Sequence, residues 1–237
     1  MIVQARLGSS RLPGKILRPL GDKTLVEQVM SRLKKLGSLV DSYIVATSHD
    51  SYPSLRAIFQ RDNDVRVFAG SEENVLERYV LASEKIGADL IVRATADNPF
   101  VSVGHVKSAL KYHVEHKGDL THYLGLPIGC GVEVISASAL RFSYQHSEKP
   151  HQREHVTPYI YENPHHFRVL EPECSGIFKR PEVRLTIDEE ADFKVAERVF
   201  DKLYRGNNDF PVSQILEIWD EESLGTLNQT VKQKVLV

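Results

Sequence analysis

Long apolar runs, cysteine and net charge are all scarce in this sequence. Its 237 residues include 30 Lys and Arg against 32 Asp and Glu, a formal net charge of −2, so no global basic field points to nucleic acid. No run approaches the roughly 18 apolar residues of a membrane helix, and Arg6 and Arg11 interrupt the apolar stretch that a secretory signal needs. The two cysteines, Cys130 and Cys174, make neither a disulfide framework nor a metal motif. These absences predict a cytoplasmic protein that binds neither nucleic acid nor a membrane.

The length and the periodicity of the chain predict one α/β domain. With 41% apolar and 26% charged residues, the composition is that of an ordinary globular protein. Short apolar segments alternate with segments of helical spacing, which predicts a parallel sheet with helices on both faces. In the first half, strands are expected at 2–3, 43–47, 65–68 and 90–92, and helices at 24–36, 53–60, 71–86 and 103–116.

The second half is less regular. Strands are expected at 132–135, 167–170 and 183–187, and helices at 138–144, 156–161, 193–203 and 215–219. Two helix starts carry clear signals: Thr24 and Glu27 form a capping box, and Ser71 is expected to cap the third helix. The apolar end of the chain, 235–237, is expected to pack on the body or on a partner chain.

Residues 5–15, ARLGSSRLPGK, follow the first expected strand and concentrate cations, glycines and serines in one loop. Glycine lets the main chain approach a ligand closely, and successive free backbone N–H groups form concavities that bind anions. Arg6, Arg11 and Lys15 add positive charge that can reach a polyphosphate. The pattern predicts a triphosphate-binding loop.

Two other interpretations of this loop compete. A Walker A loop has four residues between its glycines and a Ser or Thr after its Lys, whereas five residues separate Gly8 from Gly14 here and Ile16 follows Lys15. That interpretation fails. A solvated basic turn is the plain alternative, because short motifs also match by accident.

The segment from Gln4 to Lys15 resembles the signature loop of the sugar-acid cytidylyltransferases, which include the 3-deoxy-manno-octulosonate and acylneuraminate cytidylyltransferases. Within them it is most similar to the branch named after spore-coat polysaccharide biosynthesis protein F. The resemblance implies a Rossmann-like nucleotide-diphospho-sugar transferase fold of the GT-A type, with three layers and a mostly parallel mixed sheet. It also implies that Arg6 and Lys15 hold the nucleotide's phosphates. The residues expected to bind nucleotide are Ala5, Arg6, Gly8, Ser9, Ser10, Arg11, Lys15 and Thr95.

Asp97 follows the expected strand at 90–92, within the segment Arg-Ala-Thr-Ala-Asp-Asn-Pro. Ligands of open α/β sheets bind outside the carboxyl ends of the strands, so Asp97 should face a crevice. The residues alone favour a turn, since Asp and Asn are common in turns. The resemblance instead implies a ligand of Mg²⁺, because the family uses the Asp of an Asp-x-Pro after its central strand. Where other members carry Gln-Gly before this Asp, the chain has Thr95-Ala96, the version of the spore-coat branch.

Asp188 is the second expected metal ligand. It ends the strand expected at 183–187 and opens a helix, where an N-cap role explains it equally well. The segment from Thr186 to Phe193 resembles the family's Ile-Asp-x-x-x-Asp-hydrophobic segment, whose first Asp completes the metal site. Asp192, one helical turn on, is expected to cap or support. Mg²⁺ usually takes one or two carboxylates, phosphate oxygens and several waters, which suits this pair.

Three residues of the second half are expected to contact the acceptor. Arg153 and His155 would bind its carboxylate, for which Arg geometry is suited, and Glu133 would hydrogen-bond sugar hydroxyls. A zinc site at His151 and His155, spaced i and i+4, is less favoured because no third ligand is evident. Solvated surface roles for Glu133 and the two histidines stay open.

The resemblance implies an Mg²⁺-dependent nucleotidyltransferase that transfers CMP from CTP to a sugar acid and releases pyrophosphate, for cell-surface polysaccharide synthesis. Arg6, Lys15 and Asp97 would be its catalytic residues. The single domain, 1–237, would hold a nucleotide-binding half at about 1–118 and a sugar-binding half, with the second metal ligand, at about 119–237. Relatives with this fold are often dimers, so a homodimer is one expectation.

Two alternative functions stay open. A GT-A-type glycosyltransferase would use a nucleotide-sugar donor, but the Asp-x-Asp motif common in such enzymes appears only at Asp62-Asn63-Asp64, in an expected loop. A non-catalytic module that binds a nucleotide sugar would keep the basic loop, but it would not need both Asp97 and Asp188.

Overall fold

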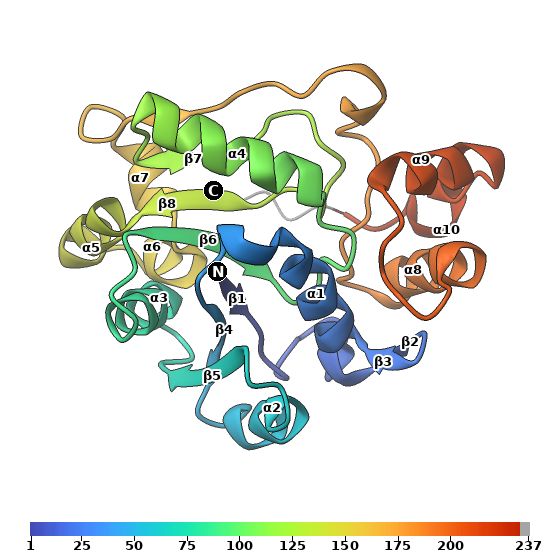
Figure 1. Ribbon diagram of the computed structural model, residues 1–237, viewed down its shortest axis with the longest axis horizontal. Coiled ribbons are helices and arrows are strands. Elements are labelled where there is room, and N and C mark those ends of the chain that lie inside the picture. The colour runs from blue at the N-terminus through green and yellow to red at the C-terminus, as the bar shows by residue number, and fades with distance from the viewer. Residues whose placement is uncertain (233–237) are drawn as a thin grey trace.

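The computed structural model describes residues 1–232, and its core is a seven-stranded sheet in the order β5-β4-β1-β6-β8-β7-β9 (Figure 1). The strands β5, β4, β1 and β6 run parallel, β8 is antiparallel to both of its neighbours, and β9 is parallel to β7. The mostly parallel mixed sheet expected from the sequence is confirmed. The strands are β1 (Ile2–Gln4), β4 (Tyr43–Ser48), β5 (Val65–Gly70), β6 (Leu90–Thr95), β7 (Leu120–Thr121), β8 (Glu133–Ser136) and β9 (Val169–Leu170), with a separate hairpin of β2 (Pro19–Leu20) and β3 (Lys23–Thr24).

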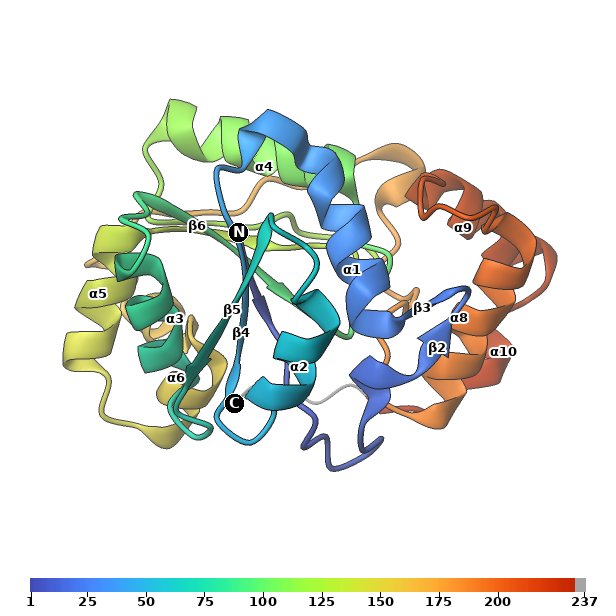
Figure 2. The same ribbon diagram turned by 60° about the horizontal axis from the view of Figure 1, so that its bottom comes forward.

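Helices cover both faces of the sheet because the strand residues alternate between two apolar clusters. Val3 of β1 packs in a cluster with α1, α2, α4, α8 and α9, whereas its neighbour Ile2 packs in a second cluster with α3, α5 and α7. Figures 1 and 2 show α8, α9 and α10 gathered at one end of the sheet. The helices are α1 (Leu25–Leu33), α2 (Tyr52–Phe59), α3 (Val75–Glu84), α4 (Val103–His116), α5 (Ala137–His146), α6 (Pro150–His155), α7 (Pro158–Glu162), α8 (Glu190–Leu203), α9 (Val212–Glu221) and α10 (Gly225–Asn228).

The parallel strands bring two distant loops together at their carboxyl ends. Gln4 pairs with Thr95 across β1 and β6, and the Gln4 carbonyl accepts a hydrogen bond from the Ala96 N–H at 2.9 Å. The Asp97 carbonyl accepts another from the Ile187 N–H, also at 2.9 Å. The basic loop, the loop after β6 and the segment before α8 therefore meet at one edge.

Several expected elements differ in the structure. The run 183–187 is extended but forms no regular strand: its pairing is one bridge from Arg184 to Ile128, and Ile187 bonds to a loop carbonyl. Ser71 does not cap α3; Asn74 does, and Ser71 Oγ accepts from the Asn74 N–H at 3.0 Å. The residues expected to pack at the end of the chain, 235–237, lie outside the described residues.

The helix expected at 156–161 begins later, at Pro158. Val156 has φ of +75°, which no helix tolerates, and it separates α6 from α7. By contrast, α4 spans the expected residues, and the capping box of Thr24 and Glu27 opens α1. Among residues 1–232, no helix combines the length and the apolar character needed to cross a membrane.

Candidate active site

A cavity of about 170 Å³ opens at the carboxyl edge of the sheet. All the residues expected to bind nucleotide line it except Gly8, and Asp97 and Asp188 line it as well. The loop folds back on itself there: the N–H groups of Ser9 and Gly14 both donate to the Leu7 carbonyl, at 2.8 and 3.0 Å. Gly14 has φ of +68°, a left-handed conformation that glycine adopts without strain.

The ammonium of Lys15 lies between the two aspartates. Its Nζ donates to Asp97 Oδ2 at 2.8 Å and to Asp188 Oδ1 at 3.1 Å, and to the Ile187 carbonyl at 2.7 Å. The lysine is only 7% exposed, so these bonds form largely out of water. Three residues that are far apart in the sequence thus converge on one point.

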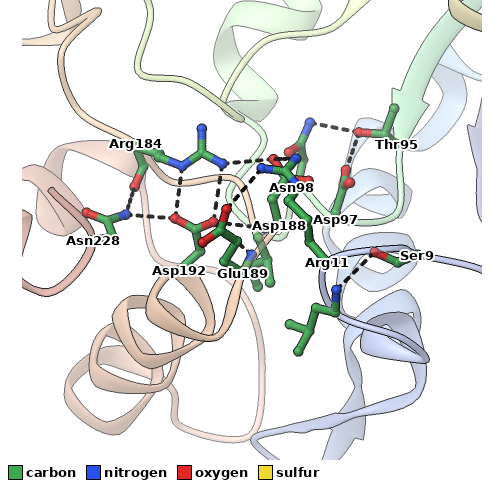
Figure 3. Close-up of polar contacts among 12 residues, drawn as sticks. Ser9, Arg11, Thr95, Asp97, Asn98, Arg184, Asp188, Glu189, Asp192 and Asn228 are labelled. Carbon is green, nitrogen blue, oxygen red and sulfur yellow. Dashed lines mark hydrogen bonds and ion pairs between the residues drawn. The ribbon is translucent and has the colours of Figure 1, made fainter. Parts of the chain in front are cut away.

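Asp188 is surrounded by positive charge (Figure 3). Its Oδ2 lies 3.1 Å from Arg11 Nη2 and accepts a hydrogen bond of 2.8 Å from Arg184 Nη2. Burial alone would raise the pKa of Asp188, but the Lys15 ammonium, together with Arg11 and Arg184, outweighs burial and holds the pKa below its ordinary value. The carboxylate is therefore kept ionised.

Asp97 is oriented by its own loop. Thr95 Oγ1 donates to Asp97 Oδ1 at 2.6 Å, and Asn98 Nδ2 donates to Thr95 Oγ1 at 2.9 Å. Sequence reasoning assigned Thr95 to the nucleotide and missed this contact, which the i, i+2 spacing of two polar residues after a strand would have suggested.

The donor set of Asp97 and Asp188 fits a hard divalent cation. One oxygen of each carboxylate lies within 3.1 Å of the same cationic nitrogen, so both can reach a single positive centre. Within residues 1–232, no group of three or more His, Cys, Asp or Glu could hold a metal ion. A pair of carboxylates completed by phosphate and water is the usual arrangement for Mg²⁺, whereas zinc at His151 and His155 finds no third ligand there.

The carboxylate of Glu133 is hydrogen-bonded to three other side chains of the protein. It accepts hydrogen bonds from Arg93 Nη1 at 2.7 Å, Thr157 Oγ1 at 2.9 Å and the Tyr161 hydroxyl at 3.0 Å. Burial, and then the charge of Glu133, raises the pKa of Tyr161, so the phenol keeps its proton. Sequence reasoning gave Arg93 no role and missed Thr157 and Tyr161, whose i, i+4 spacing places them on one side of α7.

Arg153 lines a second cavity of about 510 Å³, and Arg6 lines both cavities. The guanidinium of Arg153 donates to the Ser147 carbonyl at 3.0 and 3.3 Å. His151 bonds to Glu162, and His155, the last residue of α6, lines neither cavity. Arg153 therefore shares a cavity with Arg6 of the basic loop, whereas neither His155 nor Glu133 lines either cavity.

The Asp62-Asn63-Asp64 triplet lies away from this site. It precedes β5, and so it lies at the amino edge of the parallel strands. Asp62 and Asp64 both pair with Lys34, at 2.8 and 2.9 Å.

Two solved structures show the same fold. A cytidylyltransferase from Leptospira borgpetersenii superposes with a TM-score of 0.84 and 25% identity, covering 99% of this chain and 98% of that one. CMP:2-keto-3-deoxy-manno-octonic acid synthetase complexed with CTP superposes with a TM-score of 0.66 and 18% identity, covering 85% of this chain and 97% of that one. The second likeness shows the fold alone.

The family follows from the sequence comparisons. A family model described as cytidylyltransferase matches residues 1–221. The uncharacterized protein MJ1063 of Methanocaldococcus jannaschii is 36% identical, covering 98% of this chain and 95% of that protein. The spore coat polysaccharide biosynthesis protein SpsF of Bacillus subtilis is 35% identical, covering 85% of each. The chain belongs to the cytidylyltransferase family, and it is an enzyme of that class.

Proposed function

We propose that this enzyme transfers CMP from CTP to a sugar acid in an Mg²⁺-dependent reaction that releases pyrophosphate, for the synthesis of a cell-surface polysaccharide. The observation that supports this most directly is the convergence of Asp97 and Asp188 on Lys15 Nζ beside the basic loop. The relationship to SpsF, over 85% of both chains, supports the polysaccharide assignment. A cytoplasmic location and a homodimer stay predictions.

The charges of the site suit a metal–triphosphate. The carboxylates of Asp97, Asp188 and Asp192 are offset by the cations of Lys15, Arg11 and Arg184, through ion pairs of 2.8 to 3.1 Å. The fixed charges of the site are therefore balanced before any ligand is bound. With a metal–nucleotide bound, Asp97 and Asp188 would contact the cation and Lys15 and Arg11 would contact the phosphates, while Arg184 and Asp192, which do not line the cavity, would stay paired.

Five charged residues of the cavity have a role in the proposed reaction. Arg6, Arg11 and Lys15 bind the phosphates and offset the charge that grows on the leaving pyrophosphate. Asp97 and Asp188 hold Mg²⁺, which when bound supplies polarisation of the α-phosphate. The acceptor hydroxyl then attacks phosphorus in line, so positioning carries most of the rate.

The acceptor is proposed to enter the second cavity. Arg153 lines it, and Arg6 joins it to the first cavity, so a carboxylate held by Arg153 would lie close to the phosphates. Glu133 accepts three hydrogen bonds from the protein, so its proposed contribution is to hold Arg93 and α7 in place. His155 stays a predicted contact of the acceptor.

The two alternative functions are less well supported. For a glycosyltransferase, Asp62 and Asp64 would have to bind the metal, yet both are engaged with Lys34 at the opposite edge of the sheet. A non-catalytic module would keep the basic loop, but it would not need both Asp97 and Asp188 at the cavity.

One assay separates the three functions. The protein is incubated with Mg²⁺, each nucleoside triphosphate and a panel of sugar acids, and pyrophosphate is measured. Release that depends on both CTP and a sugar acid is the expected result. Consumption of a nucleotide sugar would instead support a glycosyltransferase, and binding without turnover would support a module. The variant Asp62→Asn/Asp64→Asn is the control, because it should keep its rate of pyrophosphate release.

A further inference from the structure

A buried polar cluster of Arg184, Asp192 and Asn228 lies beside Asp188, on the side away from Asp97 (Figure 3). Arg184 and Asn228 are 6% and 3% exposed, and the side chain of Asp192 is fully enclosed. None of these three described residues lines the cavity of the candidate site. The cluster contacts the cavity through Asp188, which does line it.

Asp192 is the centre of the cluster. Its Oδ1 accepts hydrogen bonds from Arg184 Nε at 2.9 Å and from Asn228 Nδ2 at 3.0 Å. Its Oδ2 accepts from the backbone N–H groups of Asp188 and Glu189, at 2.9 and 3.1 Å. These bonds fix the backbone where the extended segment leads into α8. They therefore fix the position of the Asp188 Cα atom, from which the side chain extends.

Arg184 connects this centre to the carboxylate of Asp188. Its Nη2 donates to Asp188 Oδ2 at 2.8 Å and to Asp192 Oδ2 at 3.2 Å, so one guanidinium joins two carboxylates. Burial would lower the pKa of Arg184, but Asp192 and Asp188 outweigh burial and raise it. With Oδ2 held in this way, Oδ1 of Asp188 points to Lys15.

Asn228 closes the cluster from α10, a short helix that packs against α8 (Figure 1). Its Nδ2 donates to Asp192 Oδ1 and also to the Arg184 carbonyl, at 3.1 Å. The family model ends at residue 221, so Asn228 comes from a part of the chain that the family match does not reach.

We propose that Asn228, acting through Asp192 and Arg184, is a positioning residue that holds the Asp188 carboxylate in the orientation that binds the metal–nucleotide. The inference rests on the proposed function, because that function makes Asp188 a metal ligand. Groups that orient a metal ligand from behind typically contribute about 10- to 100-fold in metal affinity. Asn228 bonds to Asp192 and to the Arg184 carbonyl and reaches Asp188 only through them, so its effect is expected at the lower end of that range.

The test measures Mn²⁺ binding to the full chain with CTP, followed by the electron paramagnetic resonance signal of free Mn²⁺. It compares the unchanged protein with Asn228→Ala, Asn228→Leu and Gln229→Ala. Leu has the branched outline and the number of heavy atoms of Asn, although it is larger, and it donates no hydrogen bond. The exposed Gln229 next to Asn228 is the matched control. The dissociation constant of Mn²⁺ should rise about 10-fold in both Asn228 variants and stay unchanged in Gln229→Ala. CTP binding without metal should not change in any of them.

The outcomes separate this inference from the function on which it rests. An unchanged dissociation constant with a lowered melting temperature would show that Asn228 only packs α10 on α8. Failure of both Asn228 variants to fold would lead to the same conclusion. Either result overturns the inference and leaves the proposed function intact. If the unchanged protein binds no Mn²⁺ with CTP, Asp188 has no metal to hold and both proposals fall.

Discussion

At the scale of single residues, Lys15 has two possible sets of partners, which are the aspartates of the site and the phosphates of the nucleotide. Its ammonium bonds to Asp97 and Asp188, yet the proposed reaction needs it on the phosphates. Lys15→Met removes the cation, so kcat/KM for CTP should fall about 100-fold or more. Because the carboxylates of Asp97 and Asp188 then lack their ammonium partner, the melting temperature of the variant should rise more steeply with Mg²⁺ than that of the unchanged protein. Thermal unfolding with and without Mg²⁺ measures this, and Lys111→Met, exposed on α4, is the control. If Mg²⁺ raised the melting temperature of Lys15→Met no more than that of the unchanged protein, the Lys15 ammonium and the metal would not occupy the same position between Asp97 and Asp188.

Asp97 gives a second test at this scale. The change Asp97→Asn keeps the shape of the side chain, which is about a quarter exposed, and removes the charge that a metal needs. Pyrophosphate release should fall by more than about 100-fold, while circular dichroism shows the fold retained. Full activity in this variant would remove Asp97 from the metal site.

At the scale of elements, the apolar pattern predicted burial well and pairing less well. The strands β1, β4, β5 and β6 and the helix α4 lie where the pattern placed them, because each buries the face that its own periodicity defines. The run 183–187 has the same apolar pattern, but its backbone bonds to Ile128 and Asp97 instead of a neighbouring strand. The apolar periodicity of a segment predicts which of its side chains are buried. It does not predict which other segment its backbone groups will hydrogen-bond.

The close approach of that run to the loop at 127–130 depends on Gly129. It has φ of +92°, and an added Cβ would lie 2.6 Å from the Thr186 backbone nitrogen. Gly129→Ala should therefore cost about 1–3 kcal/mol of unfolding free energy and lower activity, since the displaced segment carries Asp188. Urea unfolding measures the cost. Gly104→Ala is the matched control: it lies in α4 with no atom within 4 Å of the added Cβ, so it should be neutral or gain up to about 1 kcal/mol.

At the scale of the whole molecule, the site joins the N-terminal loop to residues 82 and 173 positions away. Local motifs predicted that Lys15, Asp97 and Asp188 each follow or end a strand, and the rule for parallel sheets brought the first two to one edge. The direct bonds between them depend on side-chain conformations that no pattern in the sequence specifies. For the same reason the bonds of Glu133 to Thr157 and Tyr161, and of Asn228 to Asp192, could not be predicted.

The ion pairs of Asp188 with Lys15 and Arg11 connect segments that are far apart in the chain. They should therefore affect how the free energy of unfolding depends on pH. The pKa of Asp188 is lowered in the folded state, so the ionised carboxylate stabilises the fold at every pH above the unfolded value of about 3.9. The contribution is lost as the pH falls from there through the folded pKa. Urea unfolding at pH 7, 5, 4 and 3 should show Asp188→Asn less stable than the unchanged protein at pH 7 and 5, with the gap closing below pH 4.

Two controls make the interpretation of this gap specific. The side chain of Asp188 is 22% exposed, so added salt should narrow the gap at pH 7 only in part. Asp50→Asn, which changes an exposed carboxylate on the loop after β4, should show little gap at any pH. A gap for Asp188→Asn that persists unchanged to pH 3 would mean that packing, and not the charge shared with Lys15, Arg11 and Arg184, makes Asp188 stabilising. The claim that the ion pairs of Asp188 with Lys15 and Arg11 stabilise the fold would then be wrong.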